Sequence, residues 1–300
     1  MMDADAPTIS VVVASCRERH LLEACLEALL PQCHQVGAEV VVARAAAASQ
    51  VEDLIRAYPG VRFVAVPGDT AIPQLRAAGM AEADGDIVAL TEDHCVVAPD
   101  WLPELVDANE RGAQVIGGAM DNAQRDRAID WAAYFAEYGF FASERGSRGR
   151  APLLTGANVA YRRDVIDQVI DWARQGEWEN VAHSRLLAQG STLEFRKTAA
   201  VYQNKNYGFG DFCRDRFLHG RSYARRRLAE EAAPKRWLYL FGSPVLPVLL
   251  SLRIARAAAS GRQRAFLRAL PFTFAFLTAW SVGEAVGYCL GPAPKERTGG

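Results

Sequence analysis

Apolar runs alternate with helical segments through the first hundred residues, and no other feature of the chain constrains its fold as strongly. Short runs rich in β-branched residues lie at positions 8–14, 39–43, 61–66 and 87–90. The segments between them, at positions 21–30, 50–58 and 72–83, have the apolar periodicity of helices, and the first helix is expected to end at Pro31. This alternation predicts βαβ units, and therefore an α/β fold with a Rossmann-like, mostly parallel sheet covered by helices on both faces.

The fourth run leads directly into three polar residues, Glu92, Asp93 and His94, within the stretch DGDIVALTEDHCVVAPDWL at positions 84–102. The carboxyl end of a strand is where open α/β sheets bind ligands. A carboxylate and a neutral imidazole suit Mn²⁺, and suit Mg²⁺ less well because Mg²⁺ prefers oxygen ligands. We therefore predict that Glu92 and His94 bind a divalent metal ion. The alternative is a polar loop in which Asp93 only caps a helix.

Charge and cysteine content exclude some classes of protein. The formal net charge of −1 gives no general attraction to nucleic acid, so no nucleic-acid partner is expected. The six cysteines form no CxxC pair and no zinc-type spacing, which is typical of reduced thiols in a cytosolic protein. The acidic first ten residues contain no apolar signal segment, so we expect the front of the chain to stay in the cytoplasm.

Two stretches, SVVVASCRERHLLEACLEAL and PGDTAIPQLRAAGMAEADGDIVALTEDHCVVAPDWL, resemble the nucleotide-sugar half of a family 2 glycosyltransferase with the GT-A fold. In that family a short acidic motif after the fourth strand holds a divalent metal ion on the sugar-nucleotide diphosphate. The resemblance places Glu92, Asp93 and His94 at this motif. It also implies that the donor is bound by Ser15, Arg17, Glu18, Arg76, Glu92 and Asp93.

The second strand departs from the family pattern. Relatives end this strand in an Asp that reads the base or ribose, whereas this chain continues with Ala43, Arg44, Ala45 and Ala46. The nucleotide base is therefore left open. Arg44 could stack on a base or contact phosphate, and the alternative is an arginine solvated at the surface.

Positions 153–163, LLTGANVAYRR, are similar to the acceptor side of the family. There Asn158 would bind sugar hydroxyls, unless it is only a turn residue. Further along, the resemblance places Glu179 at the catalytic base, with Trp178 in place of its acidic neighbour, Glu177 as the reserve candidate and His183 less favoured. The basic loop at positions 143–150 is either a substrate clamp or an ordinary surface loop.

A sugar hydroxyl becomes a good nucleophile when a carboxylate takes its proton, and a metal ion and arginines stabilise the leaving diphosphate. One carboxylate is enough for a single displacement with inversion. The family also has a motif that grips the acceptor and the diphosphate. That motif is absent from the helix predicted at positions 207–228, where Arg216, His219 and Arg221 are the candidates for this role.

Between Lys205 and Arg268 the chain carries fourteen basic residues and four acidic ones, which favours contact with anionic lipid headgroups. Positions 237–252 are apolar but short, as in an interfacial or re-entrant segment, whereas positions 269–291 are long enough to span a bilayer. The alternative is two buried helices of a soluble domain. We predict a catalytic domain at 1–205, a basic helical linker at 206–236 and membrane-associated helices at 237–300.

Together these features predict an inverting glycosyltransferase at the cytoplasmic face of the cell membrane. It would use Mn²⁺ or Mg²⁺ to move a sugar from a nucleotide-diphosphate donor to a lipid-linked or polysaccharide acceptor. A nucleotidyltransferase is disfavoured because no glycine- and lysine-rich loop follows the first strand. A non-catalytic membrane scaffold that keeps the fold is the other alternative. The glycosyltransferase hypothesis requires the side chains from Glu92 to His94 and that of Glu179 to converge on one cleft.

Overall fold

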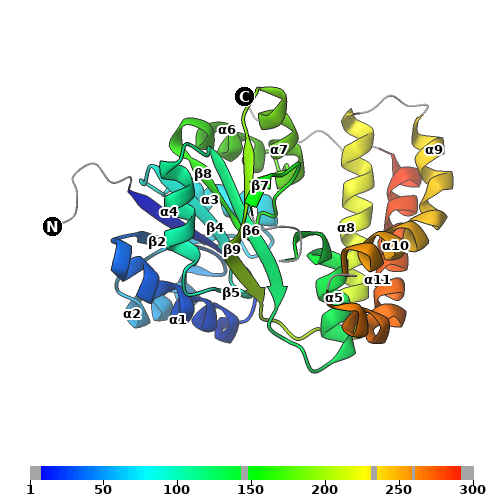
Figure 1. Ribbon diagram of the computed structural model, residues 1–300, viewed down its shortest axis with the longest axis horizontal. Helices are drawn as coiled ribbons and strands as arrows, with labels where there is room; N and C mark the ends of the chain where they lie inside the picture. Colours follow the sequence, from blue (N-terminus) through cyan, green and yellow to red (C-terminus); the bar gives the residue numbers. More distant parts are fainter. Residues whose placement is uncertain (1–7, 143–147, 231–234, 259–260, 292–300) are drawn as a thin grey trace. The chain divides into compact units, whose positions relative to one another are not determined.

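The computed structural model describes residues 8–142, 148–230, 235–258 and 261–291, and the chain divides into two compact units (Figure 1). The first unit contains residues 1–123 and 141–205, and the second contains residues 124–140 and 206–300. The predicted division into a catalytic domain at 1–205, a linker at 206–236 and membrane-associated helices at 237–300 stays a prediction.

The first unit is built on one sheet, which contains nine strands within the described residues. Its parallel half has the order β3-β2-β1-β4, formed by β1 (Ile9–Ser15), β2 (Glu39–Ala45), β3 (Val61–Val66) and β4 (Ile87–Glu92). The sheet continues through β8 (Val159–Arg162), which is antiparallel to β4 and to β6 (Val115–Asn122). β9 (Leu193–Gln203) runs parallel to β6, and β5 (Cys95–Val97) and β7 (Arg148–Arg150) pair with it in the antiparallel sense.

Helices cover both faces of this sheet, because successive side chains of each buried strand point to opposite faces. On one face Val12 of β1 packs in a core cluster with Met80 of α3 (Ile72–Ala81) and Ile166 of α6 (Arg163–Arg174), close to α7 (Glu179–Ala188). The other helices of this unit are α1 (Arg19–Val36), α2 (Ala48–Ala57) and α4 (Trp101–Glu110), and α1 contacts α4 (Figure 1). The predicted α/β fold class is confirmed.

Two local predictions in this unit need correction. α1 does not end at Pro31 but continues to Val36, where Gly37 closes it with φ of +70°. Buried contacts hold the extra turn in place, because the Gln32 side chain donates to the Ala98 carbonyl at 2.8 Å and accepts from the Leu102 amide at 3.1 Å. In the predicted loop at 143–150, residues 143–147 lie outside the described residues, and Arg148–Arg150 forms β7 instead of a loop.

The second unit is helical in its described residues and contains α5 (Ala128–Glu137), α8 (Phe209–Glu230), α9 (Lys235–Gly242), α10 (Leu246–Ala258) and α11 (Gln263–Leu290). α8 and α11 lie side by side along their length (Figure 1). Glycine makes this close approach possible, since a Cβ on Gly220 would overlap the Trp280 carbonyl and one on Gly283 would overlap the Phe217 carbonyl.

Two segments of this unit, Lys235–Ala258 and Gln263–Leu290, are long and apolar enough to cross a membrane, judged by length and composition only. The first is broken into α9, the 3₁₀ turn Ser243–Val245 and α10, and it leaves Trp237, Leu238 and Phe241 of α9 exposed. In the second, the one acidic residue, Glu284, is buried and accepts a hydrogen bond from the Tyr288 hydroxyl at 3.2 Å. Glu284 therefore faces protein, as an acid in an apolar helix must.

Candidate active site

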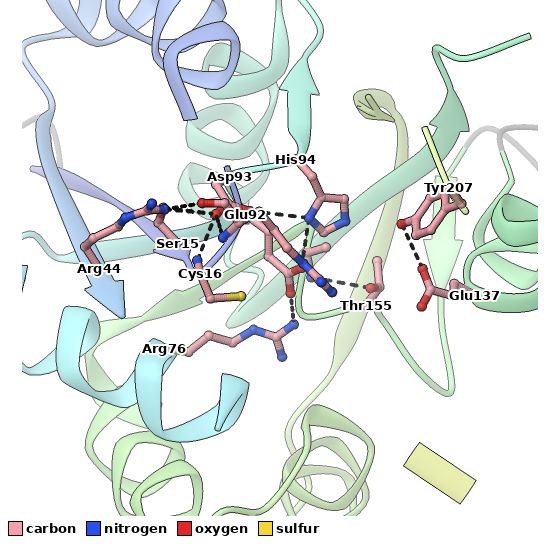
Figure 2. Close-up of polar contacts among 12 residues, drawn as sticks. Ser15, Cys16, Arg44, Arg76, Glu92, Asp93, His94, Glu137, Thr155 and Tyr207 are labelled. Carbon is pink, nitrogen blue, oxygen red and sulfur yellow. Dashed lines mark hydrogen bonds and ion pairs between the residues drawn. The ribbon is translucent and has the colours of Figure 1, made fainter. Parts of the chain in front are cut away.

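The first element of the site is a turn that follows β1 and is held by Asp93. The Asp93 Oδ2 atom accepts hydrogen bonds from the Ser15 hydroxyl at 3.0 Å, the Cys16 amide at 2.8 Å and the Arg17 amide at 2.6 Å (Figure 2). β1 and β4 are parallel neighbours, so the residue after β4 lies beside the residues that follow β1. Burial raises the pKa of Asp93, but bonds from His94, Arg17 and Ser15 outweigh burial and keep it below its usual range.

Arg44, at the end of β2, is a second support of the same turn. Its Nη1 atom donates to the Ser15 hydroxyl at 2.7 Å and to the Arg17 carbonyl at 2.6 Å, and it lies 3.6 Å from Asp93 Oδ2. The alternative of a solvated surface arginine is therefore wrong, because the side chain is 14% exposed and is bonded within the site. At the end of β2, where the family carries an Asp, this chain therefore has an arginine that binds the turn after β1.

These contacts change the roles expected of two residues. The Ser15 hydroxyl is fully buried, donates to Asp93 and accepts from Arg44, so it fixes the turn rather than facing a nucleotide. The Asp93 side chain is 1% exposed and its Oδ2 atom is occupied in the same way. Of the residues expected at the donor, Arg17 is half-buried and Glu18 is exposed just before α1 begins. A donor would therefore meet the open side of the turn.

The second element of the site is the guanidinium of Arg76, which reaches in from α3 and joins two carboxylates. Its Nη1 atom donates to Glu179 Oε2 at 2.8 Å, and its Nη2 atom donates to Glu92 Oε1. All three side chains are largely buried, with exposed fractions of 8% for Arg76, 11% for Glu92 and 20% for Glu179. Glu92 and Glu179 thus meet at one guanidinium, but only Glu179 of the two lines the described pocket. Their convergence with His94 on one cleft stays a prediction.

Glu179 is the first residue of α7 and lies at a small pocket. The pocket is also lined by Arg76, Leu90, Tyr161 and Glu177, which belong to α3, β4, β8 and the segment before α7. Burial raises the pKa of Glu179, but the charge of Arg76 and backbone hydrogen bonds outweigh it, so the pKa lies below its usual range. The result is an ionised carboxylate at the edge of a largely apolar pocket.

Glu92 and His94 provide the donor atoms predicted for a metal ion. The Nδ1 atom of His94 lies 3.5 Å from Glu92 Oε2 and 3.6 Å from Asp93 Oδ1 (Figure 2). Two ligand atoms at about this separation can both reach one ion at the usual bond length of about 2.1 Å. Among the described residues no group of three or more His, Cys, Asp or Glu side chains is arranged to hold a metal. The chemistry of the Glu92 and His94 side chains therefore fits a divalent ion that would take its further ligands from outside this pair.

Asn158 does not bind sugar hydroxyls in this structure, because its amide is fully buried and bonded within the core. It accepts from the Trp101 indole at 2.8 Å and donates to the carbonyls of Ala119 at 3.0 Å and Ala199 at 2.8 Å. These bonds join α4, β6 and β9 beside β8. The predicted acceptor contact is corrected to a structural role, which was the alternative considered from the sequence.

His183 is a buried neutral side chain. Its Nδ1 atom accepts from the Leu154 amide at 3.4 Å, and its Nε2 atom lies 2.9 Å from the Tyr161 hydroxyl. Burial lowers the pKa of His183 to about 4. Both nitrogens are engaged by protein, in agreement with the low preference given to His183 as a base.

The three residues proposed for the acceptor and the diphosphate all lie on α8 in the second unit. Arg216 is buried, lies 3.4 Å from Glu137 Oε1 and stacks its guanidinium 4.4 Å from the centre of the Trp280 ring. His219 packs against the same tryptophan, and Arg221 is half-buried. Their contact with acceptor or diphosphate stays a prediction.

Two features of the site were not predicted. The sequence indicated that Arg76 lies near the donor, but not that it bridges Glu92 and Glu179. Gly156 lies in the predicted acceptor-side segment at 153–163, and a Cβ at this position would overlap the Arg76 guanidinium. The sequence signals for these features are an arginine in a largely apolar helix and a glycine two residues before Asn158.

Comparison with known proteins identifies the family and the fold. The model of the family "Glycosyl transferase family 2" matches residues 10–170, more than half of the chain. A glucosyl-dolichyl phosphate glucuronosyltransferase from Haloferax volcanii is 27% identical over 148 residues, which cover 42% of this chain and 45% of that protein. The chain thus matches less than half the length of this relative.

Solved structures share the fold. The mannosyltransferase PcManGT from Pyrobaculum calidifontis, in complex with GDP-Man and Mn²⁺, is 17% identical with a TM-score of 0.57 over 94% of this chain and 88% of its own. GalNAc-T7 with UDP, GalNAc and Mn²⁺ is 16% identical with a TM-score of 0.53 over 67% of this chain and 44% of its own. At these identities the likeness shows the GT-A fold alone.

The fold is that of the GT-A class. The chain belongs to glycosyl transferase family 2.

Proposed function

We propose that this enzyme transfers its sugar with inversion and that Glu179 is the general base. The observation that carries the proposal is the convergence of Glu92 and Glu179 on one guanidinium at a pocket. A base must be ionised before it can accept a proton, and the lowered pKa of Glu179 keeps it so at neutral pH. Glu177, the reserve candidate, lines the same pocket but lies 3.5 Å from Arg185.

In this mechanism the acceptor hydroxyl lies against Glu179, which takes its proton as the oxygen attacks the anomeric carbon. The bond from that carbon to the nucleoside diphosphate breaks on the opposite face, so a single displacement inverts the configuration. Tyr161 and Leu90 form apolar walls of the pocket, which limit the access of competing water. Arg76 donates to the Glu179 carboxylate at 2.8 Å and would hold it toward the attacking side of the sugar.

Glu92 and His94 would hold the divalent metal ion. When bound, the ion would neutralise the charge that develops on the leaving diphosphate. An imidazole ligand favours Mn²⁺ over Mg²⁺, and the two solved relatives described above contain Mn²⁺. Arg17 and Glu18, on the open side of the β1 turn, would contact the nucleotide-sugar donor.

A lipid-linked acceptor at the membrane is the favoured partner, with a polysaccharide as the alternative. Trp237, Leu238 and Phe241 expose an apolar surface on α9, and the arginines of α8 suit anionic headgroups at the cytoplasmic face. The Haloferax volcanii relative is named for a dolichyl phosphate substrate, which supports a lipid carrier. His219 and Arg221 would serve the acceptor or the diphosphate.

Calorimetry with a panel of UDP- and GDP-sugars, in Mn²⁺, in Mg²⁺ and in EDTA, tests the donor and the metal. We expect binding that requires the metal and is at least about tenfold weaker in His94→Ala, which lacks one of two protein ligands. Metal-independent binding of equal strength in both proteins would exclude the assigned metal site.

The membrane assignment needs a separate test. Membranes that contain the full-length protein would be washed in high salt and then in detergent. We expect release by detergent only, because salt screens headgroup contacts but not apolar burial. Intact enzyme in the salt wash would contradict insertion into the bilayer.

A further inference from the structure

We propose that Arg76 is a positioning residue, which aims the Glu179 carboxylate into the pocket, and that Gly156 is required to leave space for the Arg76 guanidinium. The inference rests on the proposed role of Glu179 as the base. It assigns to Arg76 a function within the protein, whereas the sequence alone indicated a contact with the donor.

The Arg76 guanidinium is occupied by contacts within the protein. Its two terminal nitrogens bind Glu179 of α7 and Glu92 of β4. Trp178, the residue just before α7, lies with its ring 5.8 Å from the Arg76 Cζ atom. Arg76 Nε is buried and has no hydrogen-bond partner among the described residues. A planar fork with two donors aimed at two carboxylates suits arginine and is poorly reproduced by lysine.

The charges around Glu179 show why it depends on Arg76. The titratable groups around it are Arg76 from α3, Glu92 from β4, Tyr161 from β8, His183 from α7 itself and Glu177 at the pocket. His183 is neutral near pH 7, since its pKa is about 4. Arg76 is therefore the cation that offsets the burial of Glu179 among the described residues of this pocket. Without it, burial and the charge of Glu92 would both favour a protonated Glu179, which cannot act as a base.

Gly156 provides a second way to disturb the bridge without removing a charge. A Cβ at this position would overlap the Nη1 and Cζ atoms of Arg76. Those atoms are the far end of a flexible side chain, so Gly156→Ala is expected to displace the guanidinium while the fold is kept. Gly60 is the matched control, because a Cβ there has no atom within 4 Å.

The test compares full-length wild type with Arg76→Met, Arg76→Lys, Gly156→Ala and Gly60→Ala. The probes are UDP-glucose and GDP-mannose with Mn²⁺, and hydrolysis is followed from pH 5 to pH 9. We expect kcat to fall at least about tenfold near pH 7 in Arg76→Met and Gly156→Ala, with KM within about threefold. In both variants the acid limb of the kcat–pH profile should move to higher pH, so that activity recovers as pH rises. Arg76→Lys should be intermediate, and Gly60→Ala should match wild type.

A readout without turnover separates this inference from the proposed function. In protein labelled with ¹³C at the glutamate carboxyl carbon, the signal missing from Glu179→Gln identifies Glu179. Its titration should move to higher pH in Gly156→Ala and Arg76→Met, even if no tested sugar nucleotide is hydrolysed. An unchanged titration in folded variants, or a raised KM with an unchanged acid limb, would overturn the bridge and indicate a direct contact with the donor. Lack of metal-dependent donor binding by wild type would instead count against the proposed function.

Discussion

The Asp93 turn and the Arg76 bridge lie at the ends of neighbouring strands and bury acids of one short motif, yet they are stabilised in different ways. Asp93 is held by the hydroxyl of Ser15, the last residue of β1, and by two backbone amides of the turn that follows. Glu92, one residue earlier, is held by the end of a long side chain that also binds Glu179.

The difference indicates that the Asp93 turn and the Arg76 bridge have different roles. Backbone donors fixed by a parallel strand pair cannot move without disturbing the sheet, so the Asp93 turn is a rigid support. A guanidinium at the end of a flexible chain can adjust when a ligand binds, so the Arg76 bridge is suited to a working site. The comparison predicts that changes at the bridge mainly affect chemistry, whereas changes at the turn mainly affect stability.

Glu179→Gln is expected to have the largest effect on activity. Glutamine keeps an oxygen for Arg76 but cannot take a proton, so transfer or hydrolysis should fall by roughly 10²- to 10⁴-fold. Sugar-nucleotide binding and the unfolding midpoint should stay close to wild type. Steady-state kinetics, calorimetry and thermal unfolding of the same preparations measure the three quantities.

Glu177→Gln is the matched control for this change, because Glu177 lines the same pocket and is also paired with an arginine. It should keep activity within a few-fold of wild type. If Glu177→Gln lost activity and Glu179→Gln did not, the base would be Glu177. The assignment of Glu179 as the base, and with it the proposed role of Arg76, would then be wrong.

Asp93→Ala is expected to have the largest effect on stability. It leaves the Ser15 hydroxyl, two amides and Arg44 without their shared buried acceptor, which should lower the free energy of unfolding by about 3–5 kcal/mol. Glu92→Gln should cost about 1 kcal/mol, because Arg76 keeps Glu179 as an ionic partner. Urea unfolding of both variants checks the contrast, and equal losses would refute the division between support and working site.

Much of the fold was predictable because its signals are local. β3 begins and ends at the predicted residues 61–66, where turn residues bound a β-branched run on both sides. The end of α1 was not predictable, since Pro31 is a strong stop signal by itself. The helix continues because Gln32 is bonded to Ala98 and Leu102, which lie far away in sequence.

The site was predictable in its residue types but less so in its contacts. Glu92, His94 and Glu179 could be chosen because their chemistry suits a metal ion and a base at strand and helix ends. Which partner each acid takes depends on which strands are neighbours and on how far α3 reaches, and neither is written in local sequence. For this reason the sequence alone indicates neither the bonds of Arg44 to the β1 turn nor the internal bonds of Ser15 and Asn158.

A pH-dependent effect smaller than that of Asp93→Ala is expected at His183, which contacts Tyr161 of the pocket lining and tests whether this region is held as rigidly as the Asp93 turn. The folded pKa of about 4 lies below the unfolded value of about 6.5. The unfolded chain therefore binds more protons between these values, so His183 makes the fold less stable as pH falls through this window. Between pH 7.5 and pH 5 the loss should be about 2 kcal/mol. His183→Gln, which can bond Leu154 and Tyr161 without titrating, should lose correspondingly less, whereas Tyr161→Phe keeps the imidazole and should retain the dependence. Urea unfolding at the two pH values measures the difference. An equal change in the free energy of unfolding in wild type and His183→Gln would show that His183 becomes protonated in the folded protein, and that the packing around Tyr161 adjusts to the charge.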